Sequence, residues 1–313
     1  MAADLGLVWM FAGLDLTPTA PSTEPLHADG PEIWVPVESG ALAQLTHAVA
    51  CVSACQDAGA GPAAVLGHSF GELPALVAAR ALSAEQAERL ARARARAMAA
   101  LPAGRSGMLA VVGLDARRVQ RTCVALRRLG LNVAVAAFNG PDQTVVAGPS
   151  ADLQRASAEL LAAGASRVRR VPVPVAAHTP AARPVRAAVA AELQSMRLRR
   201  PSVPVYSALT SQSTTDPETL RDWTVRSIVA PVDWTGVVSR LLRDGFNHFM
   251  EIGVGVRPAL LGPILDTAAA ISPAPLVTTT YIADQADAPD GLAFAGRRIS
   301  HRKQRLELRS ALP

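Results

Sequence analysis

The sequence GHSFGE at residues 67–72 stands between a short apolar run at 63–66 and a helical pattern at 73–80. A strand, a tight glycine turn and a helix in this order are typical of α/β folds. Glycines on both sides of a serine let the chain turn sharply and present the serine Oγ at the top of a sheet. The pattern therefore predicts Ser69 as a nucleophile, with the N–H of Phe70 facing negative charge on a substrate oxygen. A chance match in a chain rich in Gly, Ala and Ser is the alternative.

The hydrophobic periodicity on either side of this turn predicts two units. Residues 108–173 follow the order strand, helix, strand, strand, helix, strand of a ferredoxin-like unit. We expect it to be a small subdomain, residues 104–171, inserted in an α/β-hydrolase-like core with a parallel sheet, residues 1–103 and 172–275. Residues 276–313 are expected to form a C-terminal basic tail. Further core strands are expected at 7–11, 203–207 and 247–252, and core helices at 42–56, 84–99, 180–196 and 232–244.

The composition is that of a water-soluble globular chain. Half of the 313 residues are hydrophobic, yet no apolar run approaches the roughly 18 residues of a membrane helix. The first residues lack the basic start and cleavage site of a secretory signal, and three cysteines cannot pair evenly. We therefore expect a cytoplasmic, monomeric protein that does not bind membranes.

The net charge of +5 comes almost entirely from arginine, since Lys303 is the only lysine. Aromatic residues make up only 4% and do not alternate with basic ones, which argues against nucleic acid binding. An acidic protein is the expected partner. A C-terminal basic cluster is either part of that partner surface or an ordinary solvated tail: Arg297, Arg298, His301, Arg302, Lys303, Arg305 and Arg309.

A serine nucleophile needs a general base, and six histidines are available. His178 follows the strand-like VPVPV at the junction where the inserted unit returns to the core, which is a position that can present a side chain to a cleft. His68 is expected to be structural or to line the pocket. His248 lies in a strand, where we expect it at the surface. The other three histidines fall in loop, helix-surface or tail contexts.

Several motifs together resemble the malonyl-type acyltransferases that serve acyl carrier proteins in fatty-acid and polyketide synthesis. GHSFGE is similar to the family's GHSxGE, and RARAM at 94–98 to its RGxxM. NGP at 139–141 with QTVVAG at 143–148 is similar to NxPxQxVxxG, and AHTP at 177–180 to the segment of the catalytic histidine. PV at 231–232 and MEIG at 250–253 match later landmarks, so the resemblance covers residues 60–265.

The resemblance implies that Ser69 takes the acyl group as an ester and that His178 removes and returns the proton. It implies that a backbone carbonyl, here that of Ser227, orients the histidine. Arg94 is implied to pair with the free carboxylate of a malonyl-type substrate, for which a planar guanidinium is suited. The alternative for Arg94 is an exposed arginine-rich helix; Arg92, Arg94 and Arg96 point to different sides, so only one of them can face the cleft.

The remaining site residues also follow from the resemblance. The N–H groups of Phe70 and Leu14 are implied to form the oxyanion hole, and His68, Ala177 and Asn139 to line the substrate site. The expected substrates are acyl-CoA or a phosphopantetheinyl acyl carrier protein, with no bound cofactor and no metal.

Three departures from the family pattern bear on activity. FAGLD at 11–15 replaces FPGQGSQ, which puts Leu14 at the glutamine position. The segment before GHSFGE is shorter than in the family, and VAAH at 175–178 is neither HAFH nor YASH. The identity of the acyl group therefore stays open, and larger or unusual acyl groups are among the candidates.

Two other function classes compete with acyl transfer. A hydrolase would be either an editing acyl-carrier hydrolase on the same scaffold or an ordinary GxSxG esterase that uses His248 with Asp233 or Asp244. A non-catalytic docking paralogue is favoured by Leu14 and the shortened segment. Because Ser69, Arg94 and His178 occur together, acyl transfer is the leading interpretation.

Overall fold

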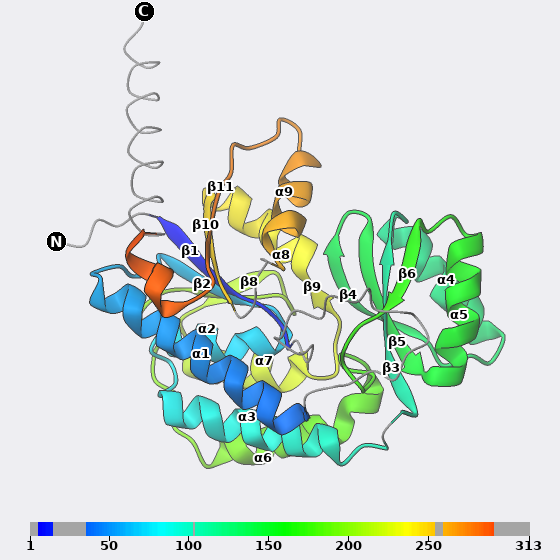
Figure 1. The fold of residues 1–313 in the computed structure, drawn as a ribbon, viewed down its shortest axis with the longest axis horizontal. Helices are drawn as coiled ribbons and strands as arrows, with labels where there is room; N and C mark the ends of the chain where they lie inside the picture. Colours follow the sequence, from blue (N-terminus) through cyan, green and yellow to red (C-terminus); the bar gives the residue numbers. More distant parts are fainter. Residues whose placement is uncertain (1–5, 15–35, 103, 254–258, 291–313) are drawn as a thin grey trace, which may run out of the picture.

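The computed structural model describes residues 6–14, 36–102, 104–253 and 259–290. Its larger sheet has six strands in the order β11-β10-β1-β2-β7-β8 (Figure 1). The first five strands are parallel and β8 is antiparallel to β7. In sheet order the strands are Thr278–Ile282, His248–Ile252, Leu7–Phe11, Ala64–Gly67, Val205–Ser207 and Gln212–Thr214.

The centre of the larger sheet is hydrophobic on both faces. Every residue of β1, with the sequence LVWMF, is buried, as expected of a parallel strand covered on both sides. Helix α3 packs against both α1 and α6, and the three helices lie along the lower side of Figure 1. The helices of this core are α1 Val37–Asp57, α2 Glu72–Ala78, α3 Ala84–Ala99, α6 Arg183–Gln194, α7 Pro217–Ser227, α8 Trp234–Arg243 and α9 Leu261–Ala269.

The smaller lobe, at the right of Figure 1, contains the predicted β-α-β-β-α-β unit. Its antiparallel strands have the order β6-β3-β5-β4, the arrangement of a ferredoxin-like fold, and enclose a second hydrophobic cluster. The predicted fold class, a parallel α/β core with an inserted ferredoxin-like unit, is confirmed. The elements are β3 Ser106–Val112, α4 Ala116–Arg128, β4 Ala134–Gly140, β5 Gln143–Pro149, α5 Ser150–Ala162 and β6 Arg167–Arg170.

Besides the two chain segments that connect them, the two lobes are joined by a strand pairing and a hydrogen bond. The short strand β9, Val232–Asp233, extends the small sheet by pairing in parallel with β4, Ala137 opposite Val232. The hydroxyl of Thr235 at the start of α8 donates to the carbonyl of Phe138, 3.3 Å away. Residues of the main-lobe chain therefore complete the inner edge of the small sheet.

Several sequence expectations need correction. Residues 276–313 are expected to form a tail, but Thr278–Ile282 is β11, whose three consecutive threonines pair along β10 at the sheet edge. The C-terminal basic cluster, Arg297 to Arg309, lies outside the described residues. Helix α1 begins at Val37, five residues before the expected start, and α7 was not expected at all.

Candidate active site

Ser69 lies on a sharp turn between β2 and α2, at the carboxyl end of the parallel strands. Its φ is 55°, in the left-handed region that only tight constraint maintains for a residue with a side chain. The flanking glycines are required by close approach: a Cβ at Gly67 would collide with the backbone of Glu72, and a Cβ at Gly71 with the carbonyl of Phe11. The GxSxG spacing thus packs the turn against β1 and α2.

The imidazole of His178 lies directly beside the serine hydroxyl. Ser69 Oγ and His178 Nε2 are 2.7 Å apart, although 109 residues separate them in sequence. On the other side of the ring, Nδ1 is 2.8 Å from the carbonyl oxygen of Ser227 and 3.2 Å from that of Ala230. Since only a protonated Nδ1 can donate to these carbonyls, Nε2 carries the lone pair that accepts the Ser69 proton.

The carbonyl that orients His178 belongs to the end of a helix. Ser227 is the last residue of α7, where carbonyl groups have no partner within the helix. Their partial negative charge favours an imidazolium when one forms. In the resting site, burial is the main cause that lowers the pKa of His178 to about 3, and the positive charge of Arg94 adds to it. His178 is therefore neutral at physiological pH and available as a base.

Arg94 reaches the same hydroxyl from α3. Its side chain is only 8% exposed, one terminal nitrogen donates to Ser69 Oγ at 3.1 Å, and its guanidinium lies 5.6 Å from the centre of the Phe70 ring. Burial lowers the pKa of Arg94 to about 10, which leaves it charged at neutral pH. A buried cation at the nucleophile is suited to hold an anionic part of a substrate.

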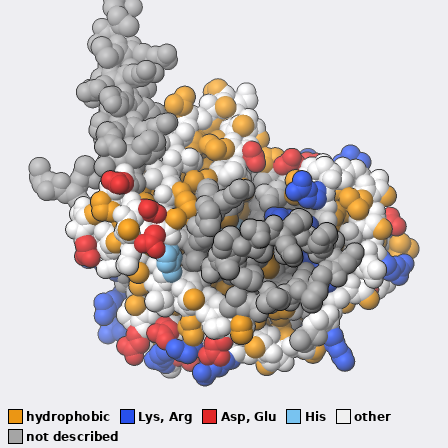
Figure 2. Space-filling model, in the orientation of Figure 1, with side chains coloured by type: hydrophobic (Ala, Val, Ile, Leu, Met, Phe, Trp, Pro, Cys, Tyr) orange, Lys and Arg blue, Asp and Glu red, His pale blue; other side chains and the backbone are white. Residues whose placement is uncertain are grey.

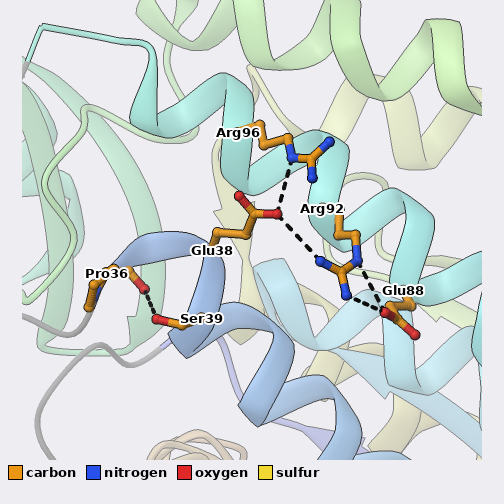
Figure 3. A network of polar contacts seen from close by, with 6 residues as sticks. All are labelled: Pro36, Glu38, Ser39, Glu88, Arg92 and Arg96. Atoms are coloured by element: carbon orange, nitrogen blue, oxygen red, sulfur yellow. Dashed lines mark hydrogen bonds and ion pairs between the residues drawn. The ribbon is translucent and has the colours of Figure 1, made fainter.

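The neighbouring arginines face away from the site. Arg92 and Arg96 both pair with Glu38 in the first turn of α1, at 3.5 and 3.1 Å, and Arg92 also pairs with Glu88 (Figure 3). These contacts link α3 to α1 on the solvent side. Of the three alternating arginines in this helix, only Arg94 points inward, as the predicted register requires.

Glu72 joins the serine helix to the helix behind His178. Its carboxylate accepts hydrogen bonds from Thr224 Oγ1 at 2.7 Å and Ser227 Oγ at 3.0 Å. Burial raises the pKa of Glu72, and the two hydroxyl donors and Arg94 oppose this shift. Glu72 is the acidic residue that ends GHSFGE, so the motif includes it, but its role as a link between the two helices is visible only in the structure.

His68 and Asn139 connect the serine turn to the small lobe. His68 Nε2 is 2.9 Å from Asn139 Oδ1 on β4, and the His68 ring packs 5.3 Å from that of Trp234. Burial lowers the pKa of His68, so this ring is neutral. Ala177, the residue before His178, is partly buried. His68 and Asn139 thus meet where the two lobes join, and Ala177 precedes the base, but none of the three is among the residues that line the pocket beside Ser69, so their substrate-lining role stays a prediction.

The loop after β1 lies against the serine turn. A Cβ at Gly13 would be 3.7 Å from Ser69 Cβ, so Gly13, which Leu14 follows in the chain, lies next to the nucleophile. Gln44 of α1 donates to the Gly13 carbonyl oxygen at 2.7 Å. The sequence alone does not indicate a role for Gln44, because a single glutamine within a helical pattern has no recognisable spacing to a motif.

A pocket opens beside Ser69 and His178. Its wall is mainly apolar and comes from α2, β7 and α7, with Glu72 and Ser207 among the polar members. Besides these, the lining residues are Gly67, Ala75, Val205, Tyr206, Ala208, Leu209, Leu220, Trp223, Ser227, Ala230, Pro231 and Val232.

The residues of the esterase alternative are not brought together. His248 is buried, not at the surface as expected, and it pairs with Leu7 at the start of β1, whereas Gly67 pairs with Phe11 at its end. Four residues along a strand correspond to about 13 Å. Asp233 caps α8, and Asp244 accepts from the Tyr206 hydroxyl at 2.6 Å.

The MEIG landmark has a structural role. Glu251 is 1% exposed, and its carboxylate accepts hydrogen bonds from the backbone N–H groups of Ala259, Leu260 and Leu261 at 2.8, 2.9 and 3.2 Å. It therefore satisfies the free N–H groups at the start of α9.

Among the described residues, no group of three or more His, Cys, Asp or Glu side chains is placed to hold a metal ion. In the same part of the chain, no helix is long and apolar enough to cross a membrane.

Comparison with known proteins identifies related sequences. The model of the acyl transferase domain family matches residues 38–295. Malonyl CoA-acyl carrier protein transacylase of Salmonella typhimurium is 36% identical over 214 residues, which are 68% of this chain and 69% of that protein. The transacylase of Staphylococcus aureus is 32% identical over the same shares.

Solved structures agree in fold. The malonyl-CoA:acyl carrier protein transacylase of Xanthomonas oryzae has a TM-score of 0.78 at 28% identity, over 94% of this chain and 98% of its own. A malonyl-transacylase in complex with its type II polyketide synthase acyl-carrier protein has a TM-score of 0.77 at 26% identity, over 91% and 99%.

Proposed function

Because the chain belongs to the acyl transferase domain family and is an enzyme of the acyltransferase type, we propose that it moves a malonyl-class acyl group to an acyl carrier protein. The donor is CoA or another carrier, the acceptor is a phosphopantetheine thiol, and an ester on Ser69 is the intermediate. The observation that carries this proposal is the convergence of His178 and Arg94 on the Ser69 hydroxyl, at 2.7 and 3.1 Å.

In the proposed first half-reaction, Ser69 Oγ attacks the thioester carbonyl while its proton passes to His178 Nε2. The carbonyl oxygen becomes an oxyanion, held by the N–H groups of Phe70 and Leu14. Collapse of this intermediate breaks the carbon–sulfur bond, and the leaving thiolate takes the proton from His178. The second half-reaction reverses these steps with the carrier thiol as nucleophile.

The resting geometry also supports a dicarboxylic acyl group. One terminal nitrogen of Arg94 lies 3.1 Å from Ser69 Oγ, so its guanidinium is within reach of the carboxylate of a malonyl-type acyl group carried on that oxygen. The two oxygens of a carboxylate match the guanidinium fork, which a neutral acyl group does not.

Replacing Arg94 by alanine should weaken the acylation of Ser69 by malonyl-type donors by roughly 2 to 5 kcal/mol in transition-state free energy, the cost of a buried, unpaired charge. Acetyl-CoA lacks that carboxylate, so acylation by acetyl-CoA should be weakened only slightly. The measurement is kcat/KM with both donors. Arg96→Ala, on the same helix but paired with Glu38, is the matched control and should retain both activities. Equal losses for malonyl and acetyl donors in Arg94→Ala would assign Arg94 a structural role.

An acidic acyl carrier protein is the proposed partner. The small lobe has ten arginines and only four acidic residues within residues 104–171. Figure 2 shows basic side chains along the outer right side of this lobe, and the arginines of β6 are exposed. Opposite charge on the carrier would accelerate its association in a salt-dependent way. A cytoplasmic monomer that needs no bound cofactor is part of the same proposal.

The test of transfer is to load the protein with malonyl-CoA, remove free donor and follow the intact mass with and without holo carrier protein. The adduct should persist for minutes alone and move to the carrier when it is added, more slowly as salt rises. Rapid release of free acid with every carrier would support an editing hydrolase. A complete absence of adduct with a panel of acyl-CoA donors would support the non-catalytic paralogue.

A further inference from the structure

One buried polar side chain near the serine belongs to neither the sequence motifs nor the dyad. Gln44 lies in the second turn of α1 and is 8% exposed. Its amide nitrogen donates to the carbonyl oxygen of Gly13 at 2.7 Å and lies 3.4 Å from that of Ala12, over 31 and 32 residues of sequence. A buried amide in a helix that reaches two carbonyls of a distant loop fixes the path of that loop.

The carbonyl that Gln44 holds shares a peptide plane with the N–H of Leu14. The only cis peptide bond among the described residues is Ser272–Pro273, so the Gly13–Leu14 bond is trans. In a trans peptide the C=O and the N–H point in opposite directions. When Gln44 holds the carbonyl on the α1 side, it turns the Leu14 N–H to the other side of the loop.

The side chains of the loop itself offer little to hold its conformation. Gly13 has no side chain and Leu14 has no polar group, while a Cβ added at Gly13 would be within contact distance of Ser69 and His68. A hydrogen bond to the carbonyl also polarises the amide and strengthens its N–H as a donor. Both effects act on the second N–H of the proposed oxyanion hole.

We propose that Gln44 is a positioning residue that orients the Gly13–Leu14 peptide so that the Leu14 N–H can donate to the oxyanion. It acts from α1 in a chain where leucine occupies the glutamine position of the loop. This inference rests on the proposed acyl transfer, because an oxyanion forms only if Ser69 attacks a carbonyl.

The surroundings of Gln44 determine which substitutions are informative. It lines a small cavity together with Phe11, Ala12, Phe70 and Gly253. Gln44→Ala enlarges this cavity, which gives water room to replace the lost donor. Gln44→Met keeps the volume, has no donor and keeps water out. A positioning role therefore predicts a loss in Gln44→Met at least as large as in Gln44→Ala.

The experiment is single-turnover acylation of Ser69, measured by rapid quench and intact mass over a range of malonyl-CoA concentrations. Removal of one oxyanion donor costs about a hundred- to a thousandfold in rate, so its misorientation should lower the maximal acylation rate by about ten- to a hundredfold. The half-saturating concentration should change little, because the interaction is made in the transition state. The pH profile should keep its shape, since His178 is untouched.

Gln86→Ala is the matched control. This glutamine also bonds to backbone groups, accepting from the Ser83 N–H at 2.9 Å and donating to the Arg197 carbonyl at 3.3 Å, but it lies at the start of α3. Its loss should lower the melting temperature and leave the maximal acylation rate unchanged. A wild-type rate in Gln44→Met, or an equal fall in Gln86→Ala, would overturn the positioning role. Failure of the acyl-serine proposal is recognised separately, by an adduct that persists in Ser69→Ala.

Discussion

Ser69→Ala should take up no acyl group from any acyl-CoA and should keep its fold. The hydroxyl is the only part of Ser69 that the proposed chemistry uses, and both serine and alanine carry a Cβ that makes the φ of 55° costly, so the substitution adds no new backbone clash. Intact-protein mass after incubation with malonyl-CoA checks the adduct, and circular dichroism checks the fold.

Ser211→Ala is a close control for this experiment. Ser211 also has a left-handed φ, 53°, but its hydroxyl donates to the carboxylate of Asp233 at 3.4 Å. This variant should acylate like the unmodified protein. An acyl mass on a peptide without Ser69 would disprove the proposed intermediate.

His178→Ala should slow the acylation of Ser69 by about a thousandfold or more, because serine and base act as a unit and little rate remains when either is lost. The residual rate should come from the oxyanion donors and from substrate binding. Stopped-flow or rapid-quench acylation measures the change directly.

His47→Ala tests whether this loss is specific. The His47 ring is also hydrogen-bonded to a backbone carbonyl, that of Ala283 at 2.7 Å, on the side of α1 that faces the end of β11. The His47→Ala variant should be acylated at the normal rate even if its melting temperature falls. If His248→Ala gave the larger defect instead, the base would have to be reassigned toward the esterase arrangement.

The positions that sequence analysis identified most clearly are those whose backbone is constrained. The two glycines around Ser69 are needed because neighbouring backbone approaches them too closely for a side chain. This requirement produces a short pattern with fixed spacing in the sequence. The ferredoxin-like unit was equally readable, because its strands and helices alternate with clear periodicity and its helices begin at side chains such as Asp115, which accepts from two backbone N–H groups.

Long-range partners could not be read in the same way. Gln44 and Glu72 act through tertiary contacts with residues 31 and more than 150 positions away, and no local pattern encodes these pairings. Helix α7 is different, since Asp216 followed by Pro217 is a recognisable helix start in the sequence. Strand β11 was missed because a run of threonines at a sheet edge has a weak hydrophobic pattern.

The pairing of β4 with β9 has a consequence for engineering. Exchange of the small lobe between relatives, with cuts only where the chain enters and leaves it, would give a foreign β4 to the native β9 and a foreign residue to His68 in place of Asn139. Such a chimera would be mismatched beside the nucleophile even if both halves folded. A graft that carries residues 231–235 together with residues 104–171 keeps the pairing of β4 with β9 intact. The exchangeable module therefore consists of two segments of the chain instead of one.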